Sequence, residues 1–339
     1  MRGSAEDVPA RGPRTVPVGI FGGLTTLDVV HRSERAPRRN EKATASRQDV
    51  SAGGPAANAA VVFAALGGHA RLVTALGTGA VARIARDDLE SHGVEVVDVT
   101  PGSAVELGVS AIRVDPTTGD RSVLSMDGAG RSVPAGPELD AETSDLVADA
   151  DLVLLDGHHP ALAEALAHAA QRIGAPIVVD AGRWRPVMAQ LLPAARTIIA
   201  SDDFRWHDGT EPDRPGVRAP WSALAHVQQV VTHGAAPFEW WTGGESGHVP
   251  VPTVQVVDTL GAGDAFHGAF AYYAARSWAS SRTTGPTGSD ALAHDALLPE
   301  HLAAAADVAA FRCSVVGPRD WLRSLPVGSR QSVVSRQRR

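Results

Sequence analysis

Two aspartates, Asp258 and Asp264, flank a run of small residues in the stretch VVDTLGAGDAFHGAF at 256–270. The small residues at 261–263 lie where a helix is predicted to begin, so their N–H groups and the positive end of the helix dipole can hold an anion. Glycine there permits backbone angles and a close approach that a side chain would block. A carboxylate beside bound phosphate is repelled unless it accepts the proton of an attacking hydroxyl. The stretch therefore predicts a base, Asp264, next to an anion hole.

A second stretch, SAGGPAANAAVVFAALGG at 51–68, also opens a predicted helix with a glycine pair. Asn58 lies in the first turns of that helix and could contact a ligand. Each stretch has a structural alternative, because a glycine-rich turn and a charge at a helix N-terminus are common without any ligand. The two stretches together favour the functional interpretation.

The elements that must position these residues alternate between strands and helices. Continuous apolar runs of strand length indicate strands buried on both faces of a parallel sheet. They are VPVGIF, RLVTAL, DLVLLD, PIVVD, RTIIA and VQQVVT, with a further strand predicted at VQVVD, 254–258. Predicted helices are PAANAAVVFAALGG, AVARIARDDLESHG, PALAEALAHAAQRIG, RPVMAQLLPAA and PEHLAAAADVAAFRCSVVG. We predict a doubly wound α/β fold with a mostly parallel central sheet, helices on its flanks, and ligands at the carboxyl ends of the strands.

Two segments, about 30–52 and 105–126, alternate polar and apolar residues, the second around a PTTGD turn. Such strands are exposed on one face, so these segments predict a small β-lid over the main sheet. The folded domain is predicted to span 15–322. Residues 1–14 and the arginine-rich tail at 323–339 are polar or lack apolar periodicity, which predicts disorder.

Composition narrows the class of partner. The chain has 339 residues, a formal net charge of −7 and one cysteine. Scattered basic residues argue against a nucleic-acid surface, and the start of the chain lacks the apolar run of a signal peptide. Apolar stretches are too short to span a bilayer. A cytoplasmic protein with a small-molecule partner, and without a membrane or nucleic-acid partner, is therefore expected.

The two glycine-containing stretches together resemble the paired signatures of the PfkB/ribokinase-like carbohydrate kinases, and the resemblance covers about residues 15–322. It implies that Asp264 is the catalytic base. It also implies that the amides of Gly261, Ala262 and Gly263 form the anion hole, which stabilises charge on the transferred phosphoryl group.

The same resemblance assigns residues to the two substrates. Asp28, Gly53, Gly54 and Asn58 match sugar-binding positions of the family, although Pro55 stands where many sugar kinases have Asn or Lys. Thr232 and Gly234 in VTHGAAPFEWW match a nucleotide-binding turn, and Thr259 matches a position near the phosphates. For Asp28 the alternative is an ordinary aspartate in a surface turn.

Several short sequence motifs resemble those of particular branches of the family. GGPAA, the VVDT–GAGD–FHGA pattern with His267, and AAFRCSVVGPRDWL are similar to sulfofructose kinases, and DTLGAGD is also found in ketohexokinases. The resemblance therefore favours a ketose-like sugar over adenosine.

The residues expected to organise the metal ion depart from the family's sequence pattern. The Asn-x-x-Glu motif that organises Mg²⁺ would fall at SDDF, 201–204, where Asp202 or Asp203 could replace the lost carboxylate through water. The alternative is that the two aspartates cap a turn. ATP and Mg²⁺ are thus the implied cofactors, and a monovalent cation is left open.

Charged residues also follow other predicted strands. DGHHP contains His158 and His159, and DAGRWRP contains Arg183 and Arg185, where an arginine would suit a sulfonate or phosphate on the sugar. Asp127, after the lid, could contact the substrate. Capping, turn or solvated roles are the alternatives for all of them.

Three hypotheses follow. The first is an ATP- and Mg²⁺-dependent sugar kinase, in which Asp264 deprotonates the hydroxyl and the lid excludes water. The second is a sugar- or nucleotide-binding protein with weak or lost turnover, since SDDF and GTGAVAR depart from family motifs. The third is a nucleoside or vitamin kinase of the same superfamily. The one-sided lid strands also predict a homodimer through the lid.

Overall fold

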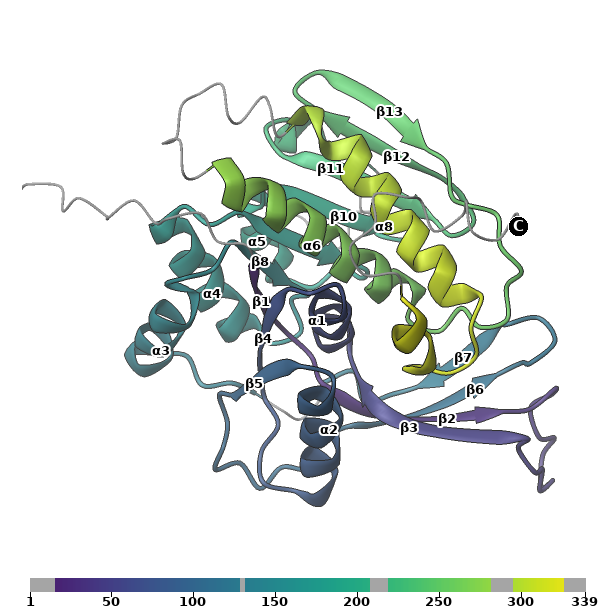
Figure 1. The fold of residues 1–339 in the computed structure, drawn as a ribbon. Helices are drawn as coiled ribbons and strands as arrows, with labels where there is room; N and C mark the ends of the chain where they lie inside the picture. Colours follow the sequence, from purple (N-terminus) through teal and green to yellow (C-terminus); the bar gives the residue numbers. More distant parts are fainter. Residues whose placement is uncertain (1–15, 129–131, 208–218, 282–294, 326–339) are drawn as a thin grey trace, which may run out of the picture.

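The computed structural model describes residues 16–128, 132–207, 219–281 and 295–325 (Figure 1). The predicted tail at 1–14 lies outside these ranges, as does the part of the C-terminal tail after residue 325. The described chain ends with a 3-10 helix, η2 (Asp320–Ser324), and the buried Leu325. It therefore reaches three residues into the segment 323–339, for which disorder is predicted.

The centre of the molecule is a large sheet with the strand order β13-β12-β11-β10-β9-β8-β1-β4-β5. The strands from β11 to β5 are parallel to one another, whereas β12 and β13 extend the sheet as an antiparallel hairpin. Their bounds are β1 (Val18–Gly22), β4 (His69–Thr74), β5 (Val94–Asp98), β8 (Leu152–Leu155), β9 (Ile177–Ala181), β10 (Thr197–Ser201), β11 (Gln228–His233), β12 (Ala236–Thr242) and β13 (Glu245–Val249).

Helices cover both faces of this sheet. Side chains of α1, α2, α6 and α8 form one buried apolar cluster with strand residues such as Phe21 and Leu72. Those of α3, α4 and α5 form a second cluster with Ile20 and Val73. Because alternate residues of a strand point to opposite faces, a strand covered by helices on both faces requires an unbroken run of apolar residues. The helices are α1 (Pro55–Ala65), α2 (Ala80–Ser91), α3 (Pro137–Val147), α4 (Pro160–Ile173), α5 (Met188–Ala194), α6 (Ala262–Ser281) and α8 (Leu298–Cys313), with the 3-10 helix η1 (Ser222–Leu224).

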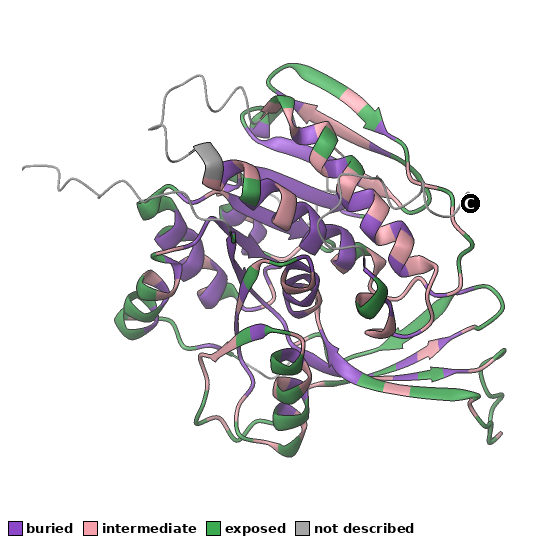
Figure 2. Cartoon of the chain, viewed as in Figure 1, coloured by how far each residue is buried: buried purple, intermediate pink, exposed green. Residues whose placement is uncertain are grey.

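A second, four-stranded sheet projects to one side of the main sheet (Figure 1). Its strands, in spatial order, are β3 (Arg47–Gly53), β2 (Thr26–Arg32), β6 (Val109–Val114) and β7 (Arg121–Leu124). Its inner face buries Val30, Ile112 and Val114, and Leu260 packs against them. All of β7 is exposed, including Leu124 at 76% (Figure 2). We call this sheet the lid sheet.

The predicted α/β class with a mostly parallel sheet is confirmed, and each of the six continuous apolar runs forms one of its strands. The strand predicted at 254–258 is wrong, since this segment is irregular in the structure. Val257 and Asp258 donate their N–H groups to the carbonyl of Cys313, at 2.9 and 3.2 Å, rather than to a neighbouring strand. The end of α8 therefore takes the donors that a strand ladder would use.

Candidate active site

The DTLGAGD stretch forms a loop that leads directly into α6. Gly261 has φ +71°, a left-handed conformation that favours glycine, and α6 begins at the next residue. The amide of Ala262 donates to the carbonyl of Thr259 at 3.3 Å. Within the described residues, the amides of Gly261 and Gly263 have no protein acceptor, and nothing lies within 4 Å of the Cβ position of Gly263. The N-terminus of a 20-residue helix is thus open to an anion.

Asp264 lies in the first turn of α6. The Nδ2 of Asn58, on α1, donates a hydrogen bond to its Oδ2 at 2.7 Å. Burial raises the pKa of Asp264 to about 7, and the nearby carboxylate of Asp180 adds to the rise. The hydrogen bond from Asn58 acts in the opposite direction. A carboxylate with a pKa near neutrality is suited to general-base catalysis, because it is basic yet partly deprotonated at pH 7.

Close packing of α1 on α6 holds these two side chains together. A Cβ atom at Gly268 on α6 would lie 2.3 Å from the carbonyl oxygen of Ala59 on α1. Glycine is therefore required at 268 for the two helix backbones to come this near. Asn58 immediately precedes Ala59, so the contact between the helices fixes the position of the Asn58 side chain relative to Asp264.

The glycine pair before α1 is needed on steric grounds. A Cβ at Gly53 would lie 2.1 Å from a carboxylate oxygen of Asp28, and one at Gly54 would lie 2.2 Å from the carbonyl oxygen of Leu24. Gly54 also has φ +101°. The pair therefore allows Asp28, on the neighbouring lid strand β2, to lie against the turn that leads to Asn58.

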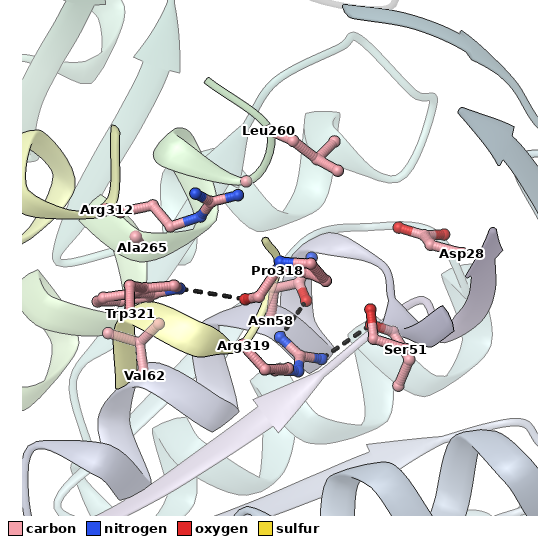
Figure 3. Close-up of a pocket in the computed structure, with 12 residues that line it drawn as sticks. Asp28, Ser51, Asn58, Val62, Leu260, Ala265, Arg312, Pro318, Arg319 and Trp321 are labelled. Atoms are coloured by element: carbon pink, nitrogen blue, oxygen red, sulfur yellow. Dashed lines mark hydrogen bonds between the residues drawn. The ribbon is translucent and has the colours of Figure 1, made fainter. Parts of the chain in front are cut away.

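Asp28 borders a pocket between the lid sheet, α1 and the motif loop (Figure 3). Burial raises its pKa, while hydrogen bonds from Thr26, at 2.8 Å, and from Ser110 oppose the rise. The pocket thus joins three of the residues assigned from the family resemblance, namely Asp28, Asn58 and Gly261. The other residues that line it are Ser51, Ala52, Val62, Leu260, Ala265, Arg312, Pro318, Arg319 and Trp321.

Arg319 is a pocket residue that the sequence analysis missed. Its Nη1 donates to Oδ1 of Asn58 at 3.0 Å and its Nη2 donates to the carbonyl of Ala52 at 2.8 Å (Figure 3). Asp88, on α2, balances its charge at 3.2 Å. Because Asn58 accepts from Arg319 through its oxygen, its nitrogen must face Asp264. Arg319 therefore orients the Asn58 amide that contacts Asp264.

Asp258, the first aspartate of the motif, is completely buried between two arginines. Arg32 of β2 lies 2.5 Å from its Oδ2, and Arg312 of α8 lies 3.2 Å from the same atom. Burial alone would raise the pKa of Asp258, but the charges of Arg312 and Arg32 outweigh burial and lower it. This carboxylate is fixed as an anion and links the lid sheet, the motif loop and α8.

Thr259 connects the motif loop to the lid sheet a second time. Its N–H and its hydroxyl both donate to the carbonyl of Gly119, in the β6–β7 turn, at 3.4 and 2.9 Å. Arg121 of β7 donates to the same hydroxyl at 3.1 Å. The Thr259 side chain therefore binds the lid turn in this structure.

A buried acid and a histidine lie beside Asp264. Asp180 is the penultimate residue of β9, and its pKa is raised by burial, against the opposing charge of His267. The Nε2 of His267 lies 3.5 Å from Oδ1 of Asp180, while its Nδ1 is 2.8 Å from the carbonyl of Gly263. Since a carbonyl only accepts, Nδ1 carries the proton in this contact. His267 thereby joins the first turn of α6 to the end of β9.

Apart from Thr259, the predicted nucleotide and metal residues lie at the ends of two adjacent strands, outside the pocket of Asp28. Thr232 is near the end of β11, and Gly234, with φ +63°, is in the following turn. Asp202, after β10, lies 3.3 Å from Nδ1 of His233, and Asp203 is exposed. In the described part of the chain, no group of three or more His, Cys, Asp or Glu side chains could hold a metal ion.

Comparison with known proteins agrees with this geometry. The family model described as pfkB family carbohydrate kinase matches residues 20–323. The chain is 32% identical to an ATP-dependent ribose-1-phosphate kinase of Halopiger xanaduensis, over 74% of this chain and 82% of that protein. It is 25% identical to mouse ketohexokinase, over 72% and 85% of the two chains.

Solved structures give the same fold. Ribokinase from Giardia lamblia superimposes with a TM-score of 0.73 at 18% identity, over 96% of this chain and 99% of that one. The Arabidopsis thaliana ribokinase, solved with ribose and ATP, gives a TM-score of 0.66 at 22% identity, over 96% and 98%. Among the described residues, no helix is both long and apolar enough to cross a membrane.

Proposed function

This chain belongs to the pfkB family of carbohydrate kinases, and we propose that it transfers the γ-phosphoryl group of ATP to a hydroxyl of a ketose-like sugar, with Asp264 as general base. One observation carries the proposal. Asp264, with a pKa raised to about 7 by burial, lies beside the open amides of Gly261 and Gly263 at the start of α6. A base and an anion hole are thus adjacent, as phosphoryl transfer requires.

The chemistry assigns a task to each group. Asp264 accepts the proton of the sugar hydroxyl as its oxygen attacks the γ-phosphorus, and the bond from that phosphorus to the bridging oxygen of ADP breaks. The amides of Gly261 and Gly263 hydrogen-bond the phosphoryl oxygens. Ala262 contributes less, because its N–H donates to Thr259. Asn58 keeps the Asp264 carboxylate in position throughout.

The sugar is proposed to lie in the pocket with Asp28 and Asn58. A carboxylate and an amide suit a polyol, since each can bond two neighbouring hydroxyls. Gly53 and Gly54 shape the turn that holds them rather than supplying side-chain contacts. Two relatives are named for ribose 1-phosphate and for ketohexose, and both of these sugars can carry a hydroxymethyl group on a five-membered ring. That group is the proposed acceptor.

ATP is proposed to extend from the anion hole toward Thr232 and Gly234 at the end of β11. The parallel strands β9, β10 and β11 lie side by side, so their carboxyl ends form one edge for the nucleotide. Thr259 is the exception among the predicted nucleotide residues. Its hydroxyl binds the lid turn, so we assign it to support of the loop.

The metal is proposed to be held mainly by ATP. Asp202 and Asp203 are both accessible, and Mg²⁺ commonly keeps several waters and binds through few protein carboxylates plus phosphates. These two aspartates fit such a role, in which the ion would neutralise phosphate charge. A monovalent cation is not proposed at Asp258, because Arg32 and Arg312 already neutralise this carboxylate.

A substrate screen tests the proposal. ADP release would be measured with ATP, Mg²⁺ and a panel of fructose, sulfofructose, ribose, ribose 1-phosphate, adenosine and pyridoxal. We expect sugar-dependent ADP release that is highest with a sugar carrying a free hydroxymethyl group. Calorimetric binding of a sugar without transfer to any compound of the panel would instead favour a binding protein that has lost turnover. Turnover of adenosine or pyridoxal alone would favour a nucleoside or vitamin kinase.

A homodimer through the lid sheet is also proposed. Val123 and Leu124 on the edge strand β7, and Val50 on β3, expose apolar side chains. An edge strand with apolar side chains is prone to pair with another chain. Sedimentation at micromolar concentration should give a dimer, and Leu124→Glu should convert it to a monomer. A monomeric wild-type chain would contradict this assembly.

A further inference from the structure

Four charged side chains meet where the lid sheet faces the carboxyl ends of β8 and β9. Asp127, three residues after β7, lies 3.0 Å from Nε2 of His158, 3.2 Å from Nη2 of Arg185 and 3.4 Å from Nη1 of Arg183. His158 follows β8, and both arginines follow β9. A single carboxylate from the lid side therefore faces three potential cationic donors on the main sheet.

The positive charge that the cationic side chains of this cluster can carry exceeds the single negative charge of Asp127. His158 is buried, and its Nδ1 lies 3.0 Å from Asp156. Burial would lower its pKa, but the Asp156 carboxylate outweighs burial and raises it. With Asp156 balancing His158, Asp127 is the carboxylate that Arg183 and Arg185 share within the described residues, and Arg185 also contacts Nε2 of His158. Arg183 is 77% exposed, so its guanidinium is accessible from solvent.

Asp127 itself is held in an unfavourable backbone conformation. Its φ is +49°, which is uncommon for a residue other than glycine. Such strain persists where surrounding contacts impose it, and it is concentrated at functional sites. The contacts here are the ion pairs with Arg185 and His158, at 3.2 and 3.0 Å. The ion pairs with Arg185 and His158, rather than the backbone preference of an aspartate, therefore hold Asp127 in this conformation.

The cluster borders the proposed sugar site on two sides. Asp156 accepts the N–H groups of Leu24, at 3.0 Å, and Ala56, at 3.2 Å, which belong to the segments that carry Asp28 and Asn58. On the lid side, the hydroxyl of Ser125 lies 3.2 Å from that of Ser110. Ser110 in turn hydrogen-bonds Asp28. The cluster and the proposed sugar site are thus connected through Asp156 on one side and through Ser125 and Ser110 on the other.

We propose that Arg183, Arg185 and His158 form a subsite for a tetrahedral oxyanion on the sugar, a phosphate or a sulfonate, and that Asp127 occupies this subsite when no such sugar is bound. The inference rests on the proposed sugar kinase function and deepens it by naming the substrate class. Arginine pairs recognise such oxyanions through charge-assisted, multidentate hydrogen bonds. An incoming phosphate would displace Asp127 and free the lid segment to close over the sugar.

Binding without ATP tests the subsite separately from turnover. Calorimetry would compare ribose 1-phosphate with ribose, and sulfofructose with fructose, so that each pair differs in the oxyanion. We expect Arg185→Gln to weaken binding of the anionic member roughly 10- to 100-fold and to leave the neutral member unchanged. Asp127→Asn should strengthen anionic binding several-fold, because the competing carboxylate is removed. Arg172→Gln, at the last turn of α4, is the matched control and should change neither.

Three results would overturn the subsite. The first is equal affinity for the anionic and neutral members of each pair. The second is weaker anionic binding in Asp127→Asn, which would make Asp127 a direct sugar contact. The third is a rise in KM for ATP alone in Arg185→Gln, which would assign the cations to the nucleotide. Arg183→Gln, at an exposed position, keeps the test decisive if Arg185→Gln does not fold, and should weaken anionic binding several-fold.

Failure of the subsite and failure of the kinase function give different patterns. A protein that phosphorylates neutral sugars with no preference for an oxyanion keeps the kinase function and loses the subsite. A protein that binds the anionic sugars through Arg185 yet transfers no phosphoryl group keeps the subsite and loses the kinase function.

Discussion

Asp258 and Asp264 belong to one short motif, Asp258 fully buried and Asp264 partly buried, yet the structure gives them opposite electrostatic surroundings. Asp258 faces two guanidinium groups, and its pKa is lowered. Asp264 faces an amide and the carboxylate of Asp180, and burial raises its pKa to about 7. The comparison shows that burial alone does not make a base. Neighbouring charges decide whether a buried carboxylate holds the structure together or exchanges a proton.

Replacing the proposed base should have the largest effect. Asp264→Asn keeps the shape of the side chain but removes the proton acceptor, so kcat should fall roughly 10²- to 10⁴-fold. The melting temperature should stay the same or rise, because a partly buried, poorly compensated charge is removed. Steady-state kinetics and thermal unfolding measure the two effects. Retention of substantial sugar phosphorylation would exclude Asp264 as the base, and Asp320→Asn, which breaks a partly exposed pair with Arg47, serves as control.

The matching substitution at Asp258 should act on stability. Asp258→Asn leaves Arg32 and Arg312 buried without a counter-charge, which should lower the free energy of unfolding by about 3–5 kcal/mol. Urea unfolding at pH 7 measures this loss. The control Asp320→Asn breaks an exposed pair with Arg47 and should cost less than about 1 kcal/mol. Similar losses in the two variants would contradict the structural role of Asp258.

The pH dependence should separate the two aspartates further. Asp264 must be deprotonated to act, so kcat/KM should rise with pH and level off above about 7. Its raised pKa means that the folded state holds a proton that the unfolded state releases near 3.8, so its contribution to stability falls as pH rises from about 4 to 7. Asp258, with a lowered pKa, contributes stability above 3.8 that is lost in more acidic solution.

Two measurements check these signs. The rise of kcat/KM with pH is followed for the wild type, and a flat profile between pH 5 and 8 would contradict the raised pKa of Asp264. Urea unfolding across the same range should show that wild type loses stability relative to Asp264→Asn as pH increases. The opposite trend would mean that Asp264, like Asp258, is stabilised as an anion.

The smallest expected effect concerns the link between the motif and the lid. Thr259→Val removes the hydroxyl that donates to Gly119 and accepts from Arg121, so the free energy of unfolding should fall by about 1 kcal/mol. Turnover should fall only a few-fold, since the amides of Gly261 and Gly263 remain. Thr259→Ser, which keeps the hydroxyl, should behave as wild type. A loss of activity as large as that of Asp264→Asn would assign Thr259 to the phosphates instead.

Most of the main sheet could be predicted because parallel strands buried on both faces need unbroken apolar runs, and six such runs are present. The segment at 254–258 shows the limit of this rule. Its apolar residues suit a strand, but their N–H groups bond the end of α8, a partner more than 50 residues away in sequence. Local pattern does not reveal which distant acceptor a backbone donor will meet.

The residues of the candidate site also divide into those that the local sequence predicts and those that only tertiary contacts reveal. Asp264, Asn58 and Asp28 stand in short motifs with glycines, whose steric need is visible in the sequence. Arg312 and Arg319 fall within the stretch AAFRCSVVGPRDWL, but no spacing rule there assigns them a role, since only the tertiary fold brings them to Asp258 and Asn58. Asp202 and Asp203 remain predictions for the metal. They lie at a strand end as expected, but no residue pattern fixes how they meet an ion.

The contact between Gly268 and Ala59 has a consequence for changing what this protein acts on. Asp264 and Asn58 lie on two helices whose spacing leaves no room for a methyl group at position 268. Their geometry is therefore part of the core and will not follow changes made at the surface. The lid strands and the segments after β8 and β9, which carry the proposed sugar and oxyanion contacts, lie outside this helix pair. Exchange of those segments between relatives should alter the accepted sugar while leaving the proton-transfer step intact.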